Sequence, residues 1–381
     1  MSLVYFVSAR ASKSSESLVN KLDTLLEVLG IRKLARPAIT ALIKVHMGAP
    51  LCTRYLRPFY VRRVVDRLRE LNANPIVTDT TGLDLDDPRG TADKYLRVAT
   101  MHGFTPETLG APIVIGDGDY GNNVFRVKVD GHRFREVSLA VVIKQAEALI
   151  NLTHFKGHEL VGIGGAVKNL AVGLAAKESK FHLHYAEKPR VEPRNCDGCG
   201  VCVEACPVNA IETYSESVRI DPHLCIGCMA CKVRCSKRAI KVVRRKSVEE
   251  VQLRMADLGA AVMKTIGRDR LFNLNFLVEV GWLCDCEHRE QGWSDLPIVP
   301  DIGILASSDP VAIDVASVDL VNQAPGIPGS KAEEVGVLAP NVDKFRAIYP
   351  GVDWKRVFVA CEDLGIGSTS YQLINLEASR R

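Results

Sequence analysis

The chain of 381 residues has few aromatic side chains, no long uncharged apolar run and little excess of charge of either sign. Aromatic residues make up 6% of it, so aliphatic side chains must fill most of the core. The longest apolar runs are interrupted by Lys44, Lys144 or Asp314 and fall short of the roughly 18–20 residues that a membrane span needs. The N-terminus has neither the basic segment nor the cleavage site of a signal peptide. We therefore expect a cytoplasmic protein that does not associate with membranes.

The net charge of +4, from 49 Lys and Arg against 45 Asp and Glu, is too small to indicate nucleic-acid binding. Basic residues nevertheless gather in one stretch, which contains Lys232, Arg234, Lys237, Arg238, Lys241, Arg244, Arg245 and Lys246. Aromatic residues are absent from this stretch, so it is not expected to stack on single-stranded nucleic acid. It fits either a solvated strand and linker or a docking patch for an acidic partner or an anionic ligand.

Cysteine is the residue type with the most informative distribution, because eight of the twelve cysteines lie between positions 196 and 235. In a chain without a secretion signal, clustered cysteines bind metal or take part in redox chemistry more often than they form disulfides. They form two runs of identical spacing, Cys196, Cys199, Cys202 and Cys206, then Cys225, Cys228, Cys231 and Cys235.

Three cysteines that are each separated by two residues can ligate one cubane cluster, whereas the fourth lies too far along and ligates the other cluster. The segment thus resembles a bacterial-type two-cluster ferredoxin module. By that resemblance, the two [4Fe–4S] clusters are held by Cys196, Cys199, Cys202 and Cys235, and by Cys225, Cys228, Cys231 and Cys206. Zinc bound by paired CxxC knuckles, and a purely structural pair of clusters, are the alternatives.

Outside this segment, strand patterns alternate with amphipathic helix patterns. The expected strands are 3–7, 39–45, 75–79, 111–118, 148–153, 274–280, 298–307, 357–365 and 371–377, with a hairpin about Asp130-Gly131. The expected helices are 18–29, 58–72, 91–102, 138–147, 247–266 and 309–322. The alternation predicts an α/β fold, a largely parallel sheet with helices on both faces. We expect residues 1–189 and 244–381 to form this discontinuous host domain, and residues 190–243 to form a small inserted α+β ferredoxin-like domain.

Polar residues follow several of the expected strands, at the edge where open parallel sheets bind their ligands. They are His46, Asp79, Asp117, Asp119, His154, Cys284, Cys286 and Asp301. Each alone is compatible with a structural role, since aspartates after strands commonly form turns or cap helices. Together they predict a polar crevice at one edge of the sheet.

Cys284 and Cys286 are the most specific pair among these residues. Thiolates at positions i and i+2 point the same way on a strand or fold together on a turn, so they can chelate one additional metal ion. His288, His154 or His158 would complete such a site. Buried inert thiols and a strained local disulfide remain the alternatives.

A glycine-rich turn precedes an expected helix that carries Lys168 and Asn169. Its exposed amides, the helix N-terminus and Lys168 would suit a phosphate or carboxylate, and close packing through small residues is the alternative. The candidate substrate-binding residues are Gly162, Gly164, Gly165, Asn169, Asp117 and Asp301, and the candidate catalytic residues are His154, His158 and Lys168.

Two long stretches, residues 153–173 and 284–314, together with shorter ones near 43–48, 76–83 and 113–118, resemble the domain of unknown function 362 family of iron–sulfur-centre proteins. The resemblance covers nearly the whole chain. It implies an intracellular prokaryotic or archaeal protein with an inserted ferredoxin module, and it implies no particular reaction.

These features predict an iron–sulfur oxidoreductase. Electrons would enter the two clusters from an acidic redox partner protein and pass to a crevice that binds a small anionic or metal-bound substrate. The runner-up hypothesis is an electron-transfer adaptor that docks to a separate enzyme, and a third is a metal-cluster carrier or assembly protein. A polar crevice with a bound ligand would favour the enzyme, and an exposed apolar patch near the clusters would favour the adaptor.

Overall fold

A large mixed sheet organises the chain in the computed structural model, which describes residues 1–34, 36–243, 247–286 and 294–377. Neighbouring strands are parallel except in the two pairs that β15 forms with β1 and β14. From one edge to the other, the strands are β16 (Tyr371–Asn375), β1 (Ser2–Ser8), β15 (Gly303–Ser307), β14 (Leu271–Leu277), β7 (Ala148–His154), β2 (Thr40–Val45), β3 (Asn74–Asp79) and β4 (Ile113–Ile115).

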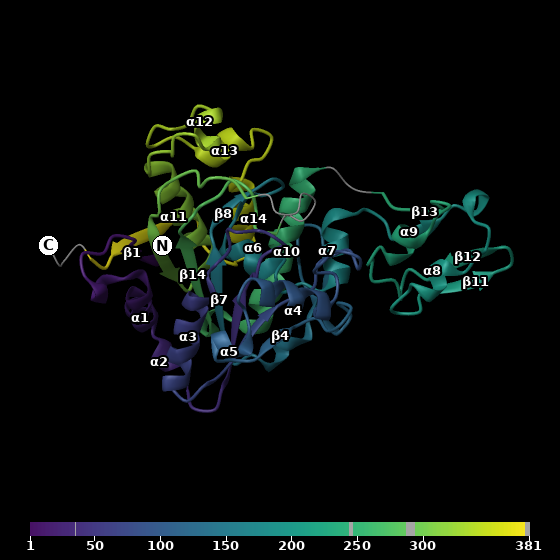
Figure 1. Cartoon of the computed structure of the whole chain (residues 1–381), viewed down its shortest axis with the longest axis horizontal. Coiled ribbons are helices and arrows are strands. Elements are labelled where there is room, and N and C mark those ends of the chain that lie inside the picture. Colours follow the sequence, from purple (N-terminus) through teal and green to yellow (C-terminus); the bar gives the residue numbers. More distant parts are fainter. Residues whose placement is uncertain (35, 244–246, 287–293, 378–381) are drawn as a thin grey trace.

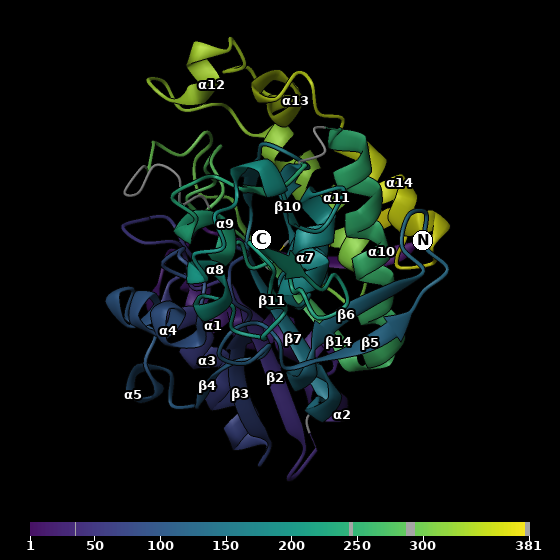
Figure 2. The same cartoon turned by 90° about the vertical axis from the view of Figure 1, so that its right-hand side faces the viewer.

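Helices cover both faces of this sheet, because every residue of its central strands β7 and β14 is buried. One face carries α1 (Leu18–Leu29), α2 (Ile31–Leu34), α3 (Pro58–Glu70), α4 (Ala92–Met101) and α5 (Pro106–Leu109). The other carries α6 (Ala166–Ala171) and α11 (Pro310–Gln323), with α10 (Val248–Ile266) and α14 (Lys355–Asp363) packed outside them. Figure 2 shows α3 and α4 on one side of the strands and α10, α11 and α14 on the other. The predicted α/β fold is confirmed.

The remaining elements outside residues 190–243 are short. They are β5 (Val124–Lys128), β6 (Glu136–Ala140), β8 (Lys156–His158), β9 (Gly162–Gly164), α7 (Lys177–His184), α12 (Lys331–Glu334) and α13 (Lys344–Ile348), with 3₁₀ turns at Ser14–Glu16, Val141–Gln145 and Arg268–Arg270. Among the described helices, none is both long enough and apolar enough to cross a membrane.

Three expectations about local structure were wrong. Residues 357–365 lie in helix α14 and not in a strand, because Val357, Phe358 and Cys361 form a buried helical face while Val359 is exposed. Residues 138–147 are the end of β6 and a 3₁₀ turn. The hairpin of β5 and β6 closes through a longer loop than the two residues expected, because the amides of residues 132–134 all donate to the Asp257 carboxylate.

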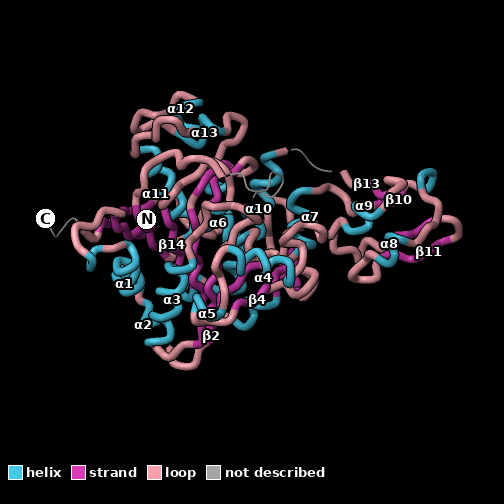
Figure 3. The backbone as a smooth tube through the Cα atoms, in the orientation of Figure 1, coloured by secondary structure: helices cyan, strands magenta, loops and turns pink. Residues whose placement is uncertain are grey.

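Residues 190–243, which we call the cysteine segment, protrude from one end of the molecule and consist mostly of loops (Figures 1 and 3). Their elements are β10 (Arg190–Val191), a 3₁₀ turn (Pro193–Asn195), α8 (Val201–Glu204), β11 (Ile211–Tyr214), β12 (Ser217–Ile220), α9 (Ala230–Arg234) and β13 (Ile240–Lys241). Strand β10 pairs with β13, which holds the two ends of the segment side by side. The rest of the chain is called the host region below. Folding of the segment as an independent domain stays a prediction.

Candidate functional site

A cavity of about 430 Å³ lies where β2, β3, β7 and β14 reach their carboxyl ends, the edge at which open α/β sheets bind ligands. Its volume is within the range of small-molecule sites. Polar residues from well-separated parts of the chain line it, among them Lys44, His46, Asp79, Arg89, Lys156, His158, Lys168, Lys180, Cys284, Asp285 and Cys286.

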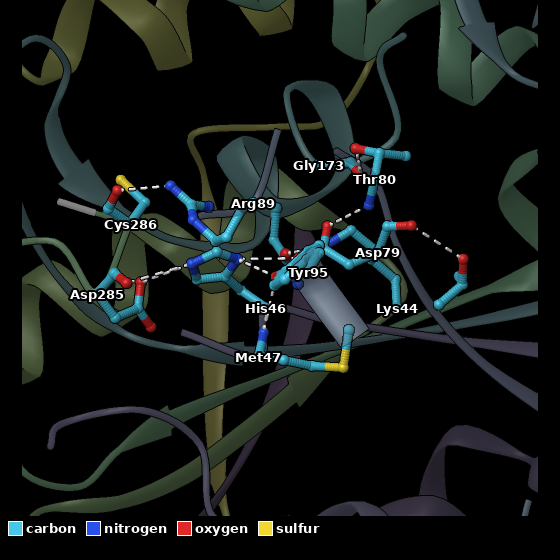
Figure 4. A network of polar contacts seen from close by, with 12 residues as sticks. Lys44, His46, Met47, Asp79, Thr80, Arg89, Tyr95, Gly173, Asp285 and Cys286 are labelled. Atoms are coloured by element: carbon cyan, nitrogen blue, oxygen red, sulfur yellow. Dashed lines mark hydrogen bonds and ion pairs between the residues drawn. The ribbon is translucent and has the colours of Figure 1, made fainter. Parts of the chain in front are cut away.

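The carboxylate of Asp79, at the end of β3, organises one side of the cavity (Figure 4). It forms an ion pair with the Lys44 ammonium at 2.9 Å, and its other oxygen lies 2.9 Å from Nδ1 of His46. The Tyr95 hydroxyl also donates to it. Burial raises the pKa of Asp79, but Lys44 and His46 outweigh burial and hold that pKa well below its usual range. Asp79 is therefore a fixed negative charge beneath the cavity.

Asp285 plays the same part on the other side, in the turn after β14. The Lys156 ammonium lies 2.9 Å from its carboxylate, and His154 Nδ1 lies 3.4 Å away. His46 Nε2 reaches the backbone oxygen of Asp285 at 3.3 Å and so links the two carboxylate centres. Burial raises the pKa of Asp285, yet Lys156 and the two histidines keep that pKa well below its ordinary value.

Cys284 and Cys286, which flank Asp285, bring their sulfurs to His158 and Lys168. One ring nitrogen of His158 and the two Sγ atoms all lie within 4.8 Å of one another. The Lys168 ammonium donates to both sulfurs at 3.4 Å. The Cys284 hydrogen bond and Lys168 lower the pKa of Cys286 well below its usual value, while burial and Cys286 raise that of Cys284. The pair thus holds one thiolate next to a lysine.

The glycine-rich turn does not offer its helix N-terminus to a ligand, which corrects part of the sequence-based expectation. The amides of Ala166 and Val167 donate to the Asp314 carboxylate at 2.6 and 2.9 Å. A Cβ on Gly165 would lie 2.3 Å from Asp314 Oδ1, so glycine permits this close approach. Gly164, Gly165, Lys168 and Asn169 do line the cavity.

Other predicted site residues support the cavity or lie outside its lining. Asp117 binds the amide and hydroxyl of Thr81 at 2.8 Å and so shapes the neighbouring loop. Asp301 is exposed and accepts from the Glu279 amide at 2.7 Å, and Gly162, at φ +82°, packs against Trp354. His154 is buried and positions Asp285.

Of the remaining sequence-based candidates, Asp119 accepts from the Ala92 amide through its backbone oxygen. His288 lies outside the described residues, as do Arg244, Arg245 and Lys246 of the basic stretch.

Sequence reasoning missed several residues that build the cavity, namely Lys44, Arg89, Tyr95, Lys156, Lys180 and Asp285. Lys44 carried a usable signal, because a lysine inside an otherwise apolar strand must find a buried partner. Lys156 lies between His154 and His158, and Asp285 lies between Cys284 and Cys286, and in both motifs the histidines and cysteines are the more specific metal ligands. Arg89, whose guanidinium donates to the Cys286 carbonyl at 2.8 Å, lies in a loop that gave no signal.

The cysteine segment divides its eight thiols into two groups of four. The inner cysteine group, Cys206, Cys225, Cys228 and Cys231, lines one small cavity. The outer cysteine group, Cys196, Cys199, Cys202 and Cys235, lines another. Backbone amides point at the sulfurs in both, with Ala210 donating to Cys206 at 3.2 Å and Ala239 to Cys235 at 3.3 Å.

The inner group adjoins the host region. The Leu85 amide donates to the Cys228 carbonyl at 2.9 Å, and Lys188 donates to the carbonyl of Cys225. Gly227 lies against the ring of Phe181, where an added Cβ would come within 2.2 Å of the ring. Leu83 and Asp84, just before Leu85, line the large cavity. One loop therefore touches both the inner cysteine group and the cavity.

The model of the family described as "Domain of unknown function (DUF362)" matches residues 41–319. A solved structure of the lactate racemase apoprotein from Thermoanaerobacterium thermosaccharolyticum is similar to this chain at 14% sequence identity and a TM-score of 0.40. The match covers 86% of this chain, which spans 59% of the length of that protein. Among curated proteins, none matches the chain.

Proposed function

The chain belongs to the domain of unknown function 362 family, and from that premise and the site geometry we propose that it is an iron–sulfur oxidoreductase. In this proposal two [4Fe–4S] clusters in the cysteine segment exchange electrons with a substrate in the cavity of the host region. The ligands are the inner group, Cys206, Cys225, Cys228 and Cys231, and the outer group, Cys196, Cys199, Cys202 and Cys235.

The grouping of the thiols supports two clusters over two zinc sites. Each group combines three cysteines of one run with the last cysteine of the other run, which is the crossed ligation of two-cluster ferredoxins. Amides that donate to the sulfurs, as from Ala210 and Ala239, stabilise the negative charge that a reduced cluster carries.

The observation that carries the proposal is the loop between the inner group and the cavity. The Leu85 amide donates a hydrogen bond to the Cys228 carbonyl, while Leu83 and Asp84 line the cavity. An electron on the inner cluster therefore has a short path through protein to a bound substrate. The outer group would then receive electrons from a redox partner.

The charged side chains of the cavity indicate what kind of substrate it would bind and where. Its lysines are already paired, Lys44 with Asp79, Lys156 with Asp285, and Lys180 with Thr80 and Thr81. Lys168 differs because its partners are the two thiols and because it is partly exposed. A small anionic or metal-bound substrate would therefore place its charged group near Lys168 and the sulfurs.

An electron-transfer adaptor is the second candidate, and exposed apolar residues on the cysteine segment favour it. Tyr214 and Val233 expose 66% and 59% of their surfaces, and Val201 and Leu224 are also exposed. Apolar residues near a redox centre are typical of docking surfaces for partner proteins. Both candidates use this surface, and only the oxidoreductase needs a ligand in the cavity.

Iron and sulfide analysis of anaerobically purified protein tests the clusters, and about eight of each per chain are expected. Cys228→Ser should lower iron by up to about half and remove the paramagnetic resonance signal of the inner cluster. Cys52→Ser, which replaces a cysteine outside both groups, is the matched control and should keep all the iron. Zinc in place of iron in native protein contradicts the proposal.

The cavity is tested by mass spectrometry of small molecules that copurify anaerobically. A ligand present in the wild type and lost in Lys168→Met supports the oxidoreductase. A cavity that retains no small molecule, in a protein whose clusters still exchange electrons with a partner, supports the adaptor.

A further inference from the structure

The geometry points to a mononuclear metal site in the host region, formed by His158, Cys284 and Cys286 and open to the cavity. The three ligand atoms already lie within 4.8 Å of one another, and all three residues line the cavity. The site is separate from the two cysteine groups and does not depend on the presence of clusters there.

The donor set and its spacing favour a borderline divalent ion such as Zn²⁺. Two thiolates and an imidazole suit zinc or iron, whereas Mg²⁺ and Ca²⁺ require oxygen ligands. Zinc binds sulfur at about 2.3 Å and nitrogen at about 2.0 Å, so ligand atoms around a tetrahedral ion lie roughly 3.5–3.8 Å apart. Small side-chain movements of His158, Cys284 and Cys286 reach that spacing.

Three protein ligands leave one position of a tetrahedral ion free, which is the pattern of catalytic zinc sites. Since the three residues line the cavity, the free position faces it. An anionic oxygen or sulfur atom of a small ligand fits this position. The Lys168 ammonium, 3.4 Å from both sulfurs, would add a second contact for the negative charge.

The turn that carries the two cysteines is held in place from its opposite side. Asp285, between them, binds Lys156 at 2.9 Å, and its Oδ1 also accepts a hydrogen bond from the Cys284 thiol at 3.6 Å. Arg89 donates to the Cys286 carbonyl at 2.8 Å, and the Tyr349 hydroxyl donates to the carbonyl of Trp282. Such outer contacts orient the ligands of metal sites. The sulfurs are therefore fixed toward His158 before any metal binds.

At constant pH, His158 provides a readout of metal binding that does not require an activity measurement. Its Nδ1 accepts a hydrogen bond from the Leu160 amide at 3.2 Å. A neutral imidazole that ligates a metal through Nε2 carries its proton on Nδ1 and cannot accept that bond. Metal binding must therefore release the Leu160 amide, and hydrogen exchange at Leu160 should become faster when Zn²⁺ is added.

The test adds Zn²⁺ to the anaerobic, iron-loaded protein. Zinc and iron are counted in the same sample, and X-ray absorption is measured at the zinc edge, where iron does not interfere. One zinc per chain is expected, with two sulfur and one nitrogen neighbours. The double variant Cys284→Ser/Cys286→Ser should lose this zinc and keep its iron, and Cys52→Ser should keep both.

His158→Ala is a second variant in case the double variant does not fold. Outer-contact changes alone weaken metal binding by about 10–100-fold, so loss of this ligand should weaken it at least about tenfold. Equal zinc in wild type and double variant, a zinc shell without sulfur, or a Cys284–Cys286 disulfide in the anaerobic protein would overturn the inference. A protein that lacks iron but still binds one zinc would contradict the proposed clusters and would still support the zinc site.

Discussion

The cysteine segment and the strand-end cavity both gather sulfur ligands, but they do so over very different distances along the chain. In the segment, three cysteines separated by two residues each share a centre with the last cysteine of the other run, and the pattern occurs twice. Helices α8 and α9 both follow a residue with positive φ, Gly200 at 76° and Met229 at 63°. The local sequence therefore brings together three of the four cysteines of each group, and the fourth comes from the other run.

The cavity is assembled from residues that the chain brings from far apart. Lys44 reaches Asn169 at 2.6 Å, and His46 reaches the Asp285 carbonyl at 3.3 Å. These contacts exist only when the parallel sheet has formed and its strand ends meet. From this comparison we predict that the segment can be removed or replaced as a unit, whereas the cavity depends on the folding of the host region.

Removing the cysteine segment is expected to have the largest effect on metal content and a small effect on the fold. Because β10 and β13 hold the segment ends together, a short Gly/Ser linker should replace residues 190–243 without straining the host region. The product should be colourless, free of cluster iron and still unfold cooperatively. Iron analysis and a denaturation curve followed by circular dichroism measure both outcomes.

Non-cooperative unfolding of this shortened chain would mean that the segment and the host region form one folding unit. The contacts of Leu85 and Phe181 with the inner cysteine group would then be essential to the host region. A shortened chain that carries Phe181→Ser as well is a useful companion, since it removes the apolar ring that the deletion exposes.

Within the host region, Asp285→Asn tests how far the cavity depends on its buried charges. The change leaves Lys156 buried without a countercharge, which destabilises proteins by about 3–5 kcal/mol. Asp301→Asn is the matched control, because Asp301 is exposed and accepts one backbone hydrogen bond, and we expect it to lose less than about 1 kcal/mol. Urea unfolding of both variants provides the comparison. Equal losses would show that the Lys156 pair does not support the fold.

How much the sequence could predict follows the same division. The crossed cysteine groups agree with the spacing, and the α/β class followed from the alternation of strands and helices. Strand ends also identified the edge of the sheet at which His46, Asp79 and the Cys284–Cys286 turn meet.

What failed concerned short segments whose structure tertiary contacts decide. Residues 357–365 looked like a buried strand because their apolar residues are consecutive, and packing against α10 selects the helix. The first amides of α6 looked available to an anion, and only the fold brings Asp314 to them. No local sequence pattern predicts that Asp285 pairs with Lys156, because 129 positions separate the two residues.

The smallest expected effect concerns Lys180, which lines the cavity and donates to Thr80 and Thr81. Burial lowers the pKa of Lys180 to about 8, although Asp117 and Asp79 partly oppose this. Its pKa in the unfolded chain is higher, so between these two values the unfolded state binds more protons, and stability rises with pH. Relative to Lys180→Met, the wild type should gain up to about 3 kcal/mol between pH 8 and about pH 10.5. Anaerobic urea unfolding at several pH values measures the difference. Lys144→Met, at an exposed lysine, should show the same pH dependence as the wild type. If Lys180→Met does so too, the ammonium is solvated in the folded protein, and the cavity is wetter at this side than its contacts imply.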